Sequence, residues 1–307
     1  MAVTVFFSPR FAEHTTPPGH PERPERTNAM ESVANRWRMK GGDVREPRRA
    51  TREELARVHT GDYLDLIESV RGRPSQLDPD TYTSPESVEI AELAAGAAIE
   101  AARLARAGTP AFAFVRPPGH HAEADRAMGF CLFNNIAVAA ADLLASGTSK
   151  AAIVDIDVHH GNGTQWTFYG EPRVLFISSH QFPFYPGTGA AGETGSGEGR
   201  GFTINIPLAA GAGDDEYDAA YRDIVQPALQ TFAPEVLLIS AGFDTWIHDP
   251  LAGMRVTAAG FARIFGRLRA AAEATCGSRV MLVTEGGYDL EGLEAGLTAG
   301  LDAFSTL

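Results

Sequence analysis

Residues 151–163 read AAIVDIDVHHGNG, an apolar run that ends in aspartates and histidines. The small and β-branched residues 151–156 predict a buried strand. Side chains of a strand alternate between its two faces, so Asp155, Asp157 and His159 would share one face near its carboxyl end. Ionisable groups this close together are costly unless a cation or mutual hydrogen bonds compensate them. The stretch therefore predicts a divalent metal site at a strand end, with loop side chains that cap the next helix as the alternative.

Six further apolar runs predict strands, and helical stretches separate most of them. The strands are expected at residues 3–7, 111–115, 174–178, 202–206, 236–240 and 280–284. Most lack strict polar and apolar alternation, which is typical of strands covered on both faces. Helices are expected at 85–107, 135–145, 214–231, 257–274 and 290–301, the first with Ser84 as N-cap, Pro85 at its first position and Gly108 after its end. This alternation predicts an α/β fold, an open and mainly parallel sheet with helices on both faces.

Composition narrows the function classes. The 307 residues are 44% hydrophobic and contain no linker, charge run or repeat, so we expect a single domain over residues 1–307. An excess of 39 acidic over 26 basic residues, a net charge of −13, argues against nucleic acid as a partner. No run approaches the roughly 18 apolar residues of a membrane span. Cys131 and Cys276 lie far apart without metal-ligand spacing, which favours buried thiols in a reducing, cytoplasmic location.

A third aspartate completes a candidate ligand set. Asp244 follows the strand expected at 236–240. A catalytic zinc takes three protein ligands and leaves one position open for water or substrate, and Asp157, His159 and Asp244 would supply such a set. Taken alone, Asp244 would serve equally well as a helix cap.

Two other loops that follow expected strands also carry reactive side chains. Residues 116–123 read RPPGHHAE, where prolines stiffen the loop and a glycine allows a turn that would aim His120 and His121 into a cleft. Paired imidazoles suit proton transfer near neutral pH. Residues 284–288 read TEGGY, and the two glycines would let Tyr288 approach a ligand and donate to a developing oxyanion. In isolation, each of these residues has a structural explanation as well.

Residues 182–201 are rich in glycine and proline and predict a long, functional surface loop. Gly187, Gly189 and Gly192 match the pattern GxGxxG, but no helix is expected to start there. A dinucleotide site is therefore not predicted.

These stretches together resemble the zinc-dependent histone deacetylase and acetylpolyamine amidohydrolase superfamily, in its class II-like bacterial branch. The resemblance spans almost the whole chain in the family's order. Its matching stretches are HPERPER at 20–26, RPPGHHAEADRAMGFCLFNN at 116–135, DIDVHHGNG at 155–163, YPGTG at 185–189, residues 241–244 with DPL at 249–251, and EGGY at 285–288. It implies an arginase/deacetylase-like three-layer α/β fold with a central, mainly parallel sheet of about eight strands.

The resemblance also implies a mechanism. One zinc ion would be held by Asp157, His159 and Asp244, His121 would act as general base and then acid, and Tyr288 would stabilise the oxyanion. His120 would add electrostatic support with Asp155 as its partner, and Asn162 would orient His121. The substrate tunnel would be lined by Gly129, Phe130, Tyr185, Leu251 and Gly287. Structural potassium ions would lie near Asp155, Asp157, His159 and Ser178, and around Phe168 and Val174.

Several alternatives remain open at this point. The substrate is expected to be acyl-lysine in a protein or peptide, because Leu251 occupies a position that is acidic in one polyamine-selective branch. An acetylated polyamine is the alternative, since Glu22, Glu86, Glu123 or Asp125 would supply acidity if they lay at the rim. A non-catalytic acyl-lysine binding protein is a remote alternative. An arginase-type binuclear hydrolase would need an Asp-x-His-x-Asp run, but Gly161 stands where its last aspartate would be, so this alternative is disfavoured. A homo-oligomer in which loops 14–26 or 182–201 meet a second copy is also considered.

Overall fold

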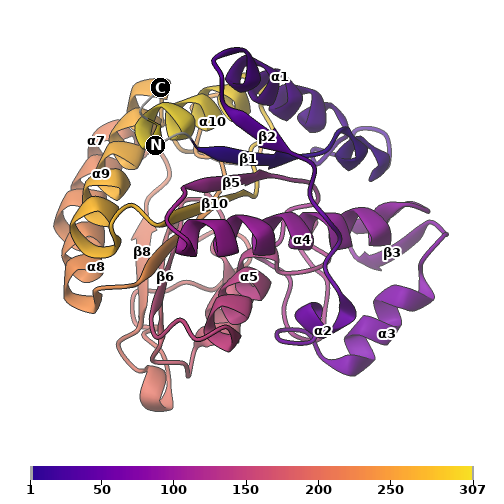
Figure 1. Cartoon of the computed structure of the whole chain (residues 1–307), viewed down its shortest axis with the longest axis horizontal. Coiled ribbons are helices and arrows are strands. Elements are labelled where there is room, and N and C mark those ends of the chain that lie inside the picture. Colours follow the sequence, from indigo (N-terminus) through magenta and orange to yellow (C-terminus); the bar gives the residue numbers. More distant parts are fainter. Residues whose placement is uncertain (1–2, 306–307) are drawn as a thin grey trace.

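The computed structural model describes residues 3–305. Its centre is an eight-stranded sheet in the order β2-β1-β5-β10-β9-β6-β7-β8, and every neighbouring pair is parallel (Figure 1). All seven predicted strands belong to it. The strands are β1 (Thr4–Phe7), β2 (Asp43–Arg45), β5 (Ala111–Phe114), β6 (Ala151–Asp155), β7 (Val174–Gln181), β8 (Thr203–Leu208), β9 (Val236–Ala241) and β10 (Val280–Thr284). The eighth strand, β2, has only three residues and none is buried, so no apolar run announces it.

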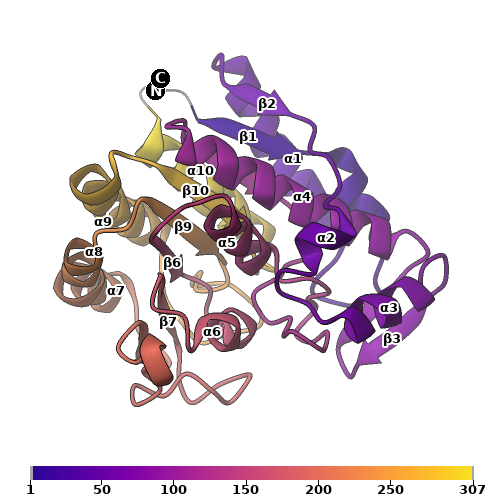
Figure 2. The ribbon, with the colours of Figure 1, turned by 60° about the horizontal axis from the view of Figure 1, so that its bottom comes forward.

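Helices cover both faces of the sheet, which confirms the predicted α/β architecture (Figures 1 and 2). The helices α4 (Ser87–Arg106) and α5 (Asn135–Ala145) pack on one face. The other face is covered by α1 (Glu25–Met39), α10 (Leu290–Phe304) and α9 (Ala258–Cys276), and α7 (Asp214–Ala220) and α8 (Gln226–Phe232) lie beside α9. The remaining elements are α2 (Arg52–Leu55), α3 (Gly61–Ser69), the hairpin of β3 (Ser75–Asp78) and β4 (Thr81–Thr83), α6 (Asn162–Phe168), the π-helical segment Tyr221–Val225, and short 3₁₀ helices at Pro9–Glu13 and Gly197–Gly199.

The predicted helices exist, but some of their bounds differ: α9 and α10 end at Cys276 and Phe304, beyond the expected 274 and 301, and two other predictions depart in ways that have a physical reason. The first long helix begins at Ser87, not at Pro85, because the Ser84 hydroxyl is engaged elsewhere: it donates to the Glu13 carbonyl at 3.2 Å and accepts from Thr15 N–H at 3.3 Å. The helix expected at 214–231 is divided into α7 and α8 by a π-helical segment, Tyr221–Val225. Pro227 lies at the start of α8, where its missing N–H cannot support a regular α-helical turn.

The core lies between the sheet and its helices. The strands β1, β5, β6, β9 and β10 are buried over their whole length, as the continuous apolar runs predict. Both cysteines are buried and free, as expected from their spacing. No helix within residues 3–305 combines the length and the apolar character that a membrane crossing requires.

The topology fixes where the reactive loops meet. Four neighbouring central strands, β5, β10, β9 and β6, end at the same edge because they are parallel. The loops that follow them carry the histidine pair, the tyrosine and the candidate metal ligands. An open α/β sheet places its sites at the carboxyl ends of its strands, so this edge is where a site is expected.

Candidate active site

The loops after β6 and β9 bring three metal-binding side chains together. One ligand atom each from Asp157, His159 and Asp244 lies within 4.8 Å of the others, and all three residues are buried. The His159 Nδ1 atom is 3.2 Å from Asp157 Oδ1 and 3.1 Å from Asp244 Oδ2. β6 itself ends at Asp155, so Asp157 and His159 belong to the following loop and not to the strand. The loop still brings together the three residues that the sequence singles out.

The surroundings of this set fit a divalent cation. Asp157 and Asp244 are fully buried, and burial together with the charge of Asp157 raises the pKa of Asp244 to about 7. Gly286 lies directly against both carboxylates: its N–H donates to Asp157 Oδ2 at 2.8 Å, and a Cβ there would collide with both. Two carboxylates and one imidazole form a nitrogen and oxygen donor set of the kind that zinc uses in three-ligand catalytic sites. The residues present are therefore suited to hold such an ion.

The two adjacent histidines of the loop after β5 lie beside this set and differ in charge state. Their ring centroids are 4.0 Å apart. His120 Nδ1 is 2.9 Å from Asp155 Oδ2, and His121 Nδ1 is 2.8 Å from Asn162 Oδ1. Burial opposes charge on His120, but Asp155 and Asp157 outweigh it and raise its pKa to about 10. Burial, with His120 nearby, lowers the pKa of His121 well below its ordinary value, so His121 is a neutral imidazole that can accept a proton.

An arginase-type binuclear site would need an additional carboxylate at position 161, where this chain has a glycine with no space for a side chain. A Cβ at Gly161 would collide with Asp155 Oδ2 and lie 3.2 Å from His120 Nδ1. A carboxylate side chain has no room there in this arrangement.

A cavity of about 80 Å³ gives access to these groups. It is lined by His121, His159 and Tyr288 together with Asp80, Gly129, Phe130, Tyr185 and Leu251. Four of the five predicted tunnel residues thus line it. The exception is Gly287, which is not among the lining residues: its carbonyl accepts from Arg26 Nε at 2.8 Å, and a Cβ there would lie 3.0 Å from Phe243 Cβ.

The glycine-rich loop after β7 forms one wall of the cavity. The Tyr185 ring lies 5.2 Å from the His121 ring and is 37% exposed. Phe184 stacks on His159, with centroids 5.5 Å apart and planes at 17°. No α-helix starts within residues 182–201, so the GxGxxG match has none of the context of a dinucleotide site.

Arg26 of α1 packs against the Tyr288 ring. The Arg26 guanidinium carbon lies 5.1 Å from the centre of the Tyr288 ring. Arg26 also donates to the backbone carbonyls of Glu285 and Gly287, at 2.5 and 2.8 Å. These contacts fix the loop that carries the phenol, and the sequence pattern gave this arginine no role of its own.

Arg26 belongs to a fully buried cluster of its own, which we call the arginine cluster. It comprises Glu22, Arg26, Arg116 and His14. The Glu22 carboxylate accepts from Arg26 Nη1 at 2.9 Å, and from Arg116 Nε and Nη2, the latter at 2.7 Å. His14 Nε2 lies 3.4 Å from the same carboxylate. The expectation that Glu22 supplies acidity at the rim is therefore wrong, because two guanidinium groups hold it inside.

Three other carboxylates act at this site without having been assigned a role from sequence. Glu285 accepts from the backbone N–H groups of Gly119 and His120 at 2.6 and 3.0 Å. Asp249 accepts from Tyr288 N–H at 2.7 Å. Asp80, between β3 and β4, lines the cavity. Asp249 and Glu285 belong to the stretches DPL at 249–251 and EGGY at 285–288, so the sequence could have identified them as site residues. No local sequence pattern distinguishes Asp80.

The residues expected around potassium are also near one another in pairs. Asp155 and Ser178 are register partners on β6 and β7. Phe168 ends α6 and Val174 begins β7, and the Glu171 backbone links them: its N–H donates to the Phe168 carbonyl at 3.0 Å, and its carbonyl accepts from Val174 N–H at 3.3 Å.

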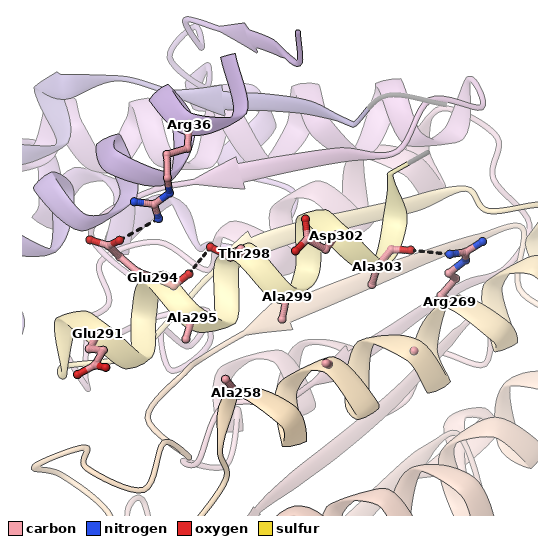
Figure 3. A pocket seen from close by; sticks show the side chains of 12 residues that line it. Arg36, Ala258, Arg269, Glu291, Glu294, Ala295, Thr298, Ala299, Asp302 and Ala303 are labelled. Atoms are coloured by element: carbon pink, nitrogen blue, oxygen red, sulfur yellow. Dashed lines mark hydrogen bonds and ion pairs between the residues drawn. The ribbon is translucent and has the colours of Figure 1, made fainter. Parts of the chain in front are cut away.

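A larger hollow than this cavity lies elsewhere. A groove of about 610 Å³ runs between α9 and α10 and is bordered by Arg36 of α1 (Figure 3). Small side chains form most of its floor, and Arg36 pairs with Glu294 at 2.8 Å. No histidine lines it, so the chemistry points to the smaller cavity at the sheet edge.

Comparison with known proteins agrees with this geometry. The family model described as "Histone deacetylase domain" matches residues 20–304. A "Probable deacetylase" of Archaeoglobus fulgidus is 40% identical over 95% of this chain and 83% of its own length. The "Histone deacetylase-like amidohydrolase" of Pseudomonas aeruginosa is 41% identical over 88% of this chain and 73% of its own.

A plant relative extends the match to structure. "Histone deacetylase 15" of Arabidopsis thaliana is 42% identical over 91% of this chain, which spans about half, 52%, of that protein. The solved structure described as "Crystal Structure of HDA15 HD domain" superimposes with a TM-score of 0.93 at 39% identity, covering 99% of this chain and 90% of that one. On this fold, these loops and these matches, the chain belongs to the histone deacetylase domain family.

Proposed function

We propose that this deacetylase-family chain is a zinc-dependent amidohydrolase that removes acetyl or other acyl groups from lysine side chains of proteins or peptides. The observation that carries the proposal is the position of the ligand set: Asp157, His159 and Asp244 lie beside a neutral imidazole and a phenol in one narrow cavity. A zinc ion held there would polarise the acyl carbonyl and make water acidic.

The protein groups divide the remaining work. His121, neutral at working pH, takes the proton of the attacking water and returns it to the leaving amine. The buried Tyr288 phenol, whose pKa burial raises well above its ordinary value, stays protonated and donates to the carbonyl oxygen as negative charge develops. His120, held by Asp155, places a positive charge beside the reaction. The products are a carboxylate and a free amine.

The cavity wall favours a thin, extended substrate. Phe130 and Tyr185 offer aromatic faces to an alkyl chain, and Leu251 is apolar at the position that would be acidic in a polyamine-selective relative. Asp80 lines the same cavity and offers an acceptor to a substrate N–H. Because Asp80 would also attract a polyamine, an acetylated polyamine stays the second candidate.

The test compares zinc-loaded wild type with Tyr288→Phe on an acetyl-lysine peptide and on N-acetylputrescine or N-acetylspermidine. We expect peptide turnover that a chelator abolishes and that Tyr288→Phe lowers about 10²–10³-fold, as for other oxyanion donors. Tyr217→Phe is the matched control, since the buried Tyr217 hydroxyl has no hydrogen-bond partner among the described residues. A much higher kcat/KM on the polyamine would move the substrate to the second candidate.

Absence of turnover by the zinc-loaded protein on every acylated amine would contradict the enzyme and favour a non-catalytic acyl-lysine binding protein. The same proposal has three further parts. Structural potassium ions would lie near Asp155 and Ser178 and around Phe168 and Val174. The chain would form a single domain, and the protein would be located in the cytoplasm.

A further inference from the structure

The side-chain amide of Asn162 can adopt two orientations that exchange its oxygen and its nitrogen, and the neighbouring groups select one of them. The Asn162 Nδ2 group lies 2.7 Å from Glu123 Oε1, 3.3 Å from Met128 Sδ and 3.5 Å from the carbonyl of His121. All three partners accept hydrogen bonds and none can donate, so the nitrogen end of the amide must face them. Asn162 is 2% exposed, so water does not relax this requirement.

The orientation of the amide in turn decides which nitrogen of His121 carries the proton. Asn162 Oδ1 lies 2.8 Å from His121 Nδ1 and can only accept. His121 Nδ1 must therefore carry its proton, which leaves the Nε2 lone pair free on a ring that lines the cavity. A flipped amide would present N–H to Nδ1, move the proton to Nε2 and remove the base.

We infer that Glu123 is a positioning residue that acts through Asn162 to hold His121 as the Nδ1–H tautomer. The carboxylate is the strongest of the three acceptors, and Arg126 Nη2 donates to it at 2.8 Å. The inference rests on the proposed role of His121 as base. It adds a third member, Glu123, to the pair that the sequence predicts.

The backbone at Glu123 is held independently of its side chain. Glu123 N–H donates to the Arg126 carbonyl at 3.0 Å, and the Glu123 carbonyl lies 3.0 Å from His59 Nδ1. Glu123→Gln therefore changes the acceptor and leaves these backbone contacts, so we expect the variant to fold.

Three variants separate positioning from a merely structural role. In Glu123→Gln the side chain can donate or accept, so only the two weaker acceptors, Met128 Sδ and the His121 carbonyl, still favour the amide orientation. We expect kcat to fall about 10–100-fold with little change in KM, as for other partners that orient a reacting group. Asn162→Asp alone should also lower kcat, because it places two carboxylates in contact. The double variant Glu123→Gln with Asn162→Asp restores a donor opposite an acceptor, and an aspartate accepts from His121 Nδ1 in either orientation. We expect its kcat to return to within about threefold of wild type, the reverse of additive losses.

The ring nitrogens report the tautomer directly. In zinc-loaded protein labelled with ¹⁵N-histidine, long-range ¹H–¹⁵N spectra should show His121 protonated at Nδ1 in wild type and in the double variant, and a substantial Nε2–H population in Glu123→Gln. Glu171→Gln is the matched control, because the Glu171 side chain also pairs with a nearby arginine, Arg173, at 2.6 Å, and only the Glu171 backbone, which the substitution leaves in place, contacts Phe168 and Val174. An unchanged His121 spectrum in Glu123→Gln, or additive losses in the double variant, would overturn the inference. The spectra decide it even if the wild type hydrolyses no acylated amine, which would overturn the proposed function instead.

Discussion

Two buried clusters of charged side chains lie on either side of the loop after β10 and balance their charge in opposite ways. The metal cluster, Asp157, His159 and Asp244, has two carboxylates and no basic side chain with a permanent charge. In the arginine cluster, two guanidinium groups surround the single carboxylate of Glu22. Gly286 N–H donates to the first cluster, and the carbonyls on either side of it accept from the second. The two guanidinium groups find their acceptors within the protein, in Glu22 and in two backbone carbonyls, and so hold a loop, whereas two carboxylates that share the single imidazole of His159 form a donor set suited to a divalent ion.

The largest expected effect follows from removing the ion that the metal cluster requires. A chelator should reduce hydrolysis of an acetyl-lysine peptide to the uncatalysed background, and added zinc should restore it. The arginine cluster needs no ion, so near-ultraviolet circular dichroism should show that the metal-free protein keeps its tertiary structure. Full activity after exhaustive chelation, with zinc absent by elemental analysis, would contradict a metal-dependent reaction.

The next largest effect should come from unbalancing the arginine cluster. Glu22→Gln leaves Arg26 and Arg116 buried without their carboxylate, and loss of one partner of a buried ion pair typically lowers the free energy of unfolding by about 3–5 kcal/mol. Urea unfolding of the two proteins measures the difference. Glu171→Gln, at the partly exposed pair with Arg173, should change it by less than about 1 kcal/mol. Equal losses in the free energy of unfolding for the two substitutions would mean that the buried cluster contributes no more to stability than a partly exposed ion pair.

The contrast between the clusters also explains what the sequence could predict. The metal cluster follows strands whose apolar runs are easy to recognise, and parallel strands bring their carboxyl ends to one edge, so the residue types after β6 and β9 were sufficient. The same reasoning located seven strands and missed β2, which is short and not buried.

The arginine cluster could not be predicted in this way. Glu22 and Arg26 lie in a loop and at the start of α1, far along the chain from Arg116 and the loop after β10, and polar residues of this kind are ordinarily exposed. Only the tertiary fold brings them together and buries them. Asp80 was missed for the same reason, since it reaches the cavity from a two-stranded hairpin outside the main sheet.

A smaller effect should appear at acidic pH, where the arginine cluster loses the part of its stabilisation that depends on the charge of Glu22. Burial opposes charge on Glu22, but Arg116 outweighs it and holds the pKa of Glu22 well below its ordinary value of 4.5. The folded pKa is therefore lower than the unfolded one, so the stabilisation is complete above pH 4.5 and is lost as pH falls below it, by up to about 1.4 kcal/mol per pH unit. Unfolding free energies measured from neutral pH down to about pH 3 should show the gap between wild type and Glu22→Gln closing only in the acid part. A gap that stays constant over this range would contradict a lowered pKa.

The smallest expected effect is the change in stability of a metal-free variant, and its sign separates the clusters most clearly. Asp244→Asn in the metal-free protein removes one of two neighbouring negative charges and leaves Asp157 as the carboxylate partner of His159. It keeps an Oδ1 acceptor for Val158 N–H, which now donates to Asp244 at 2.9 Å. We expect the metal-free variant to unfold at a free energy equal to wild type or higher by about 1 kcal/mol, where Glu22→Gln is destabilised. Adding zinc should stabilise wild type, by about 4 kcal/mol at a thousandfold excess over its Kd, and should stabilise the variant less at the same concentration, because one of the three ligands is lost. A metal-free variant that loses stability as Glu22→Gln does would mean that Asp244 is matched within the protein, and the metal cluster would then lose its claim on an ion.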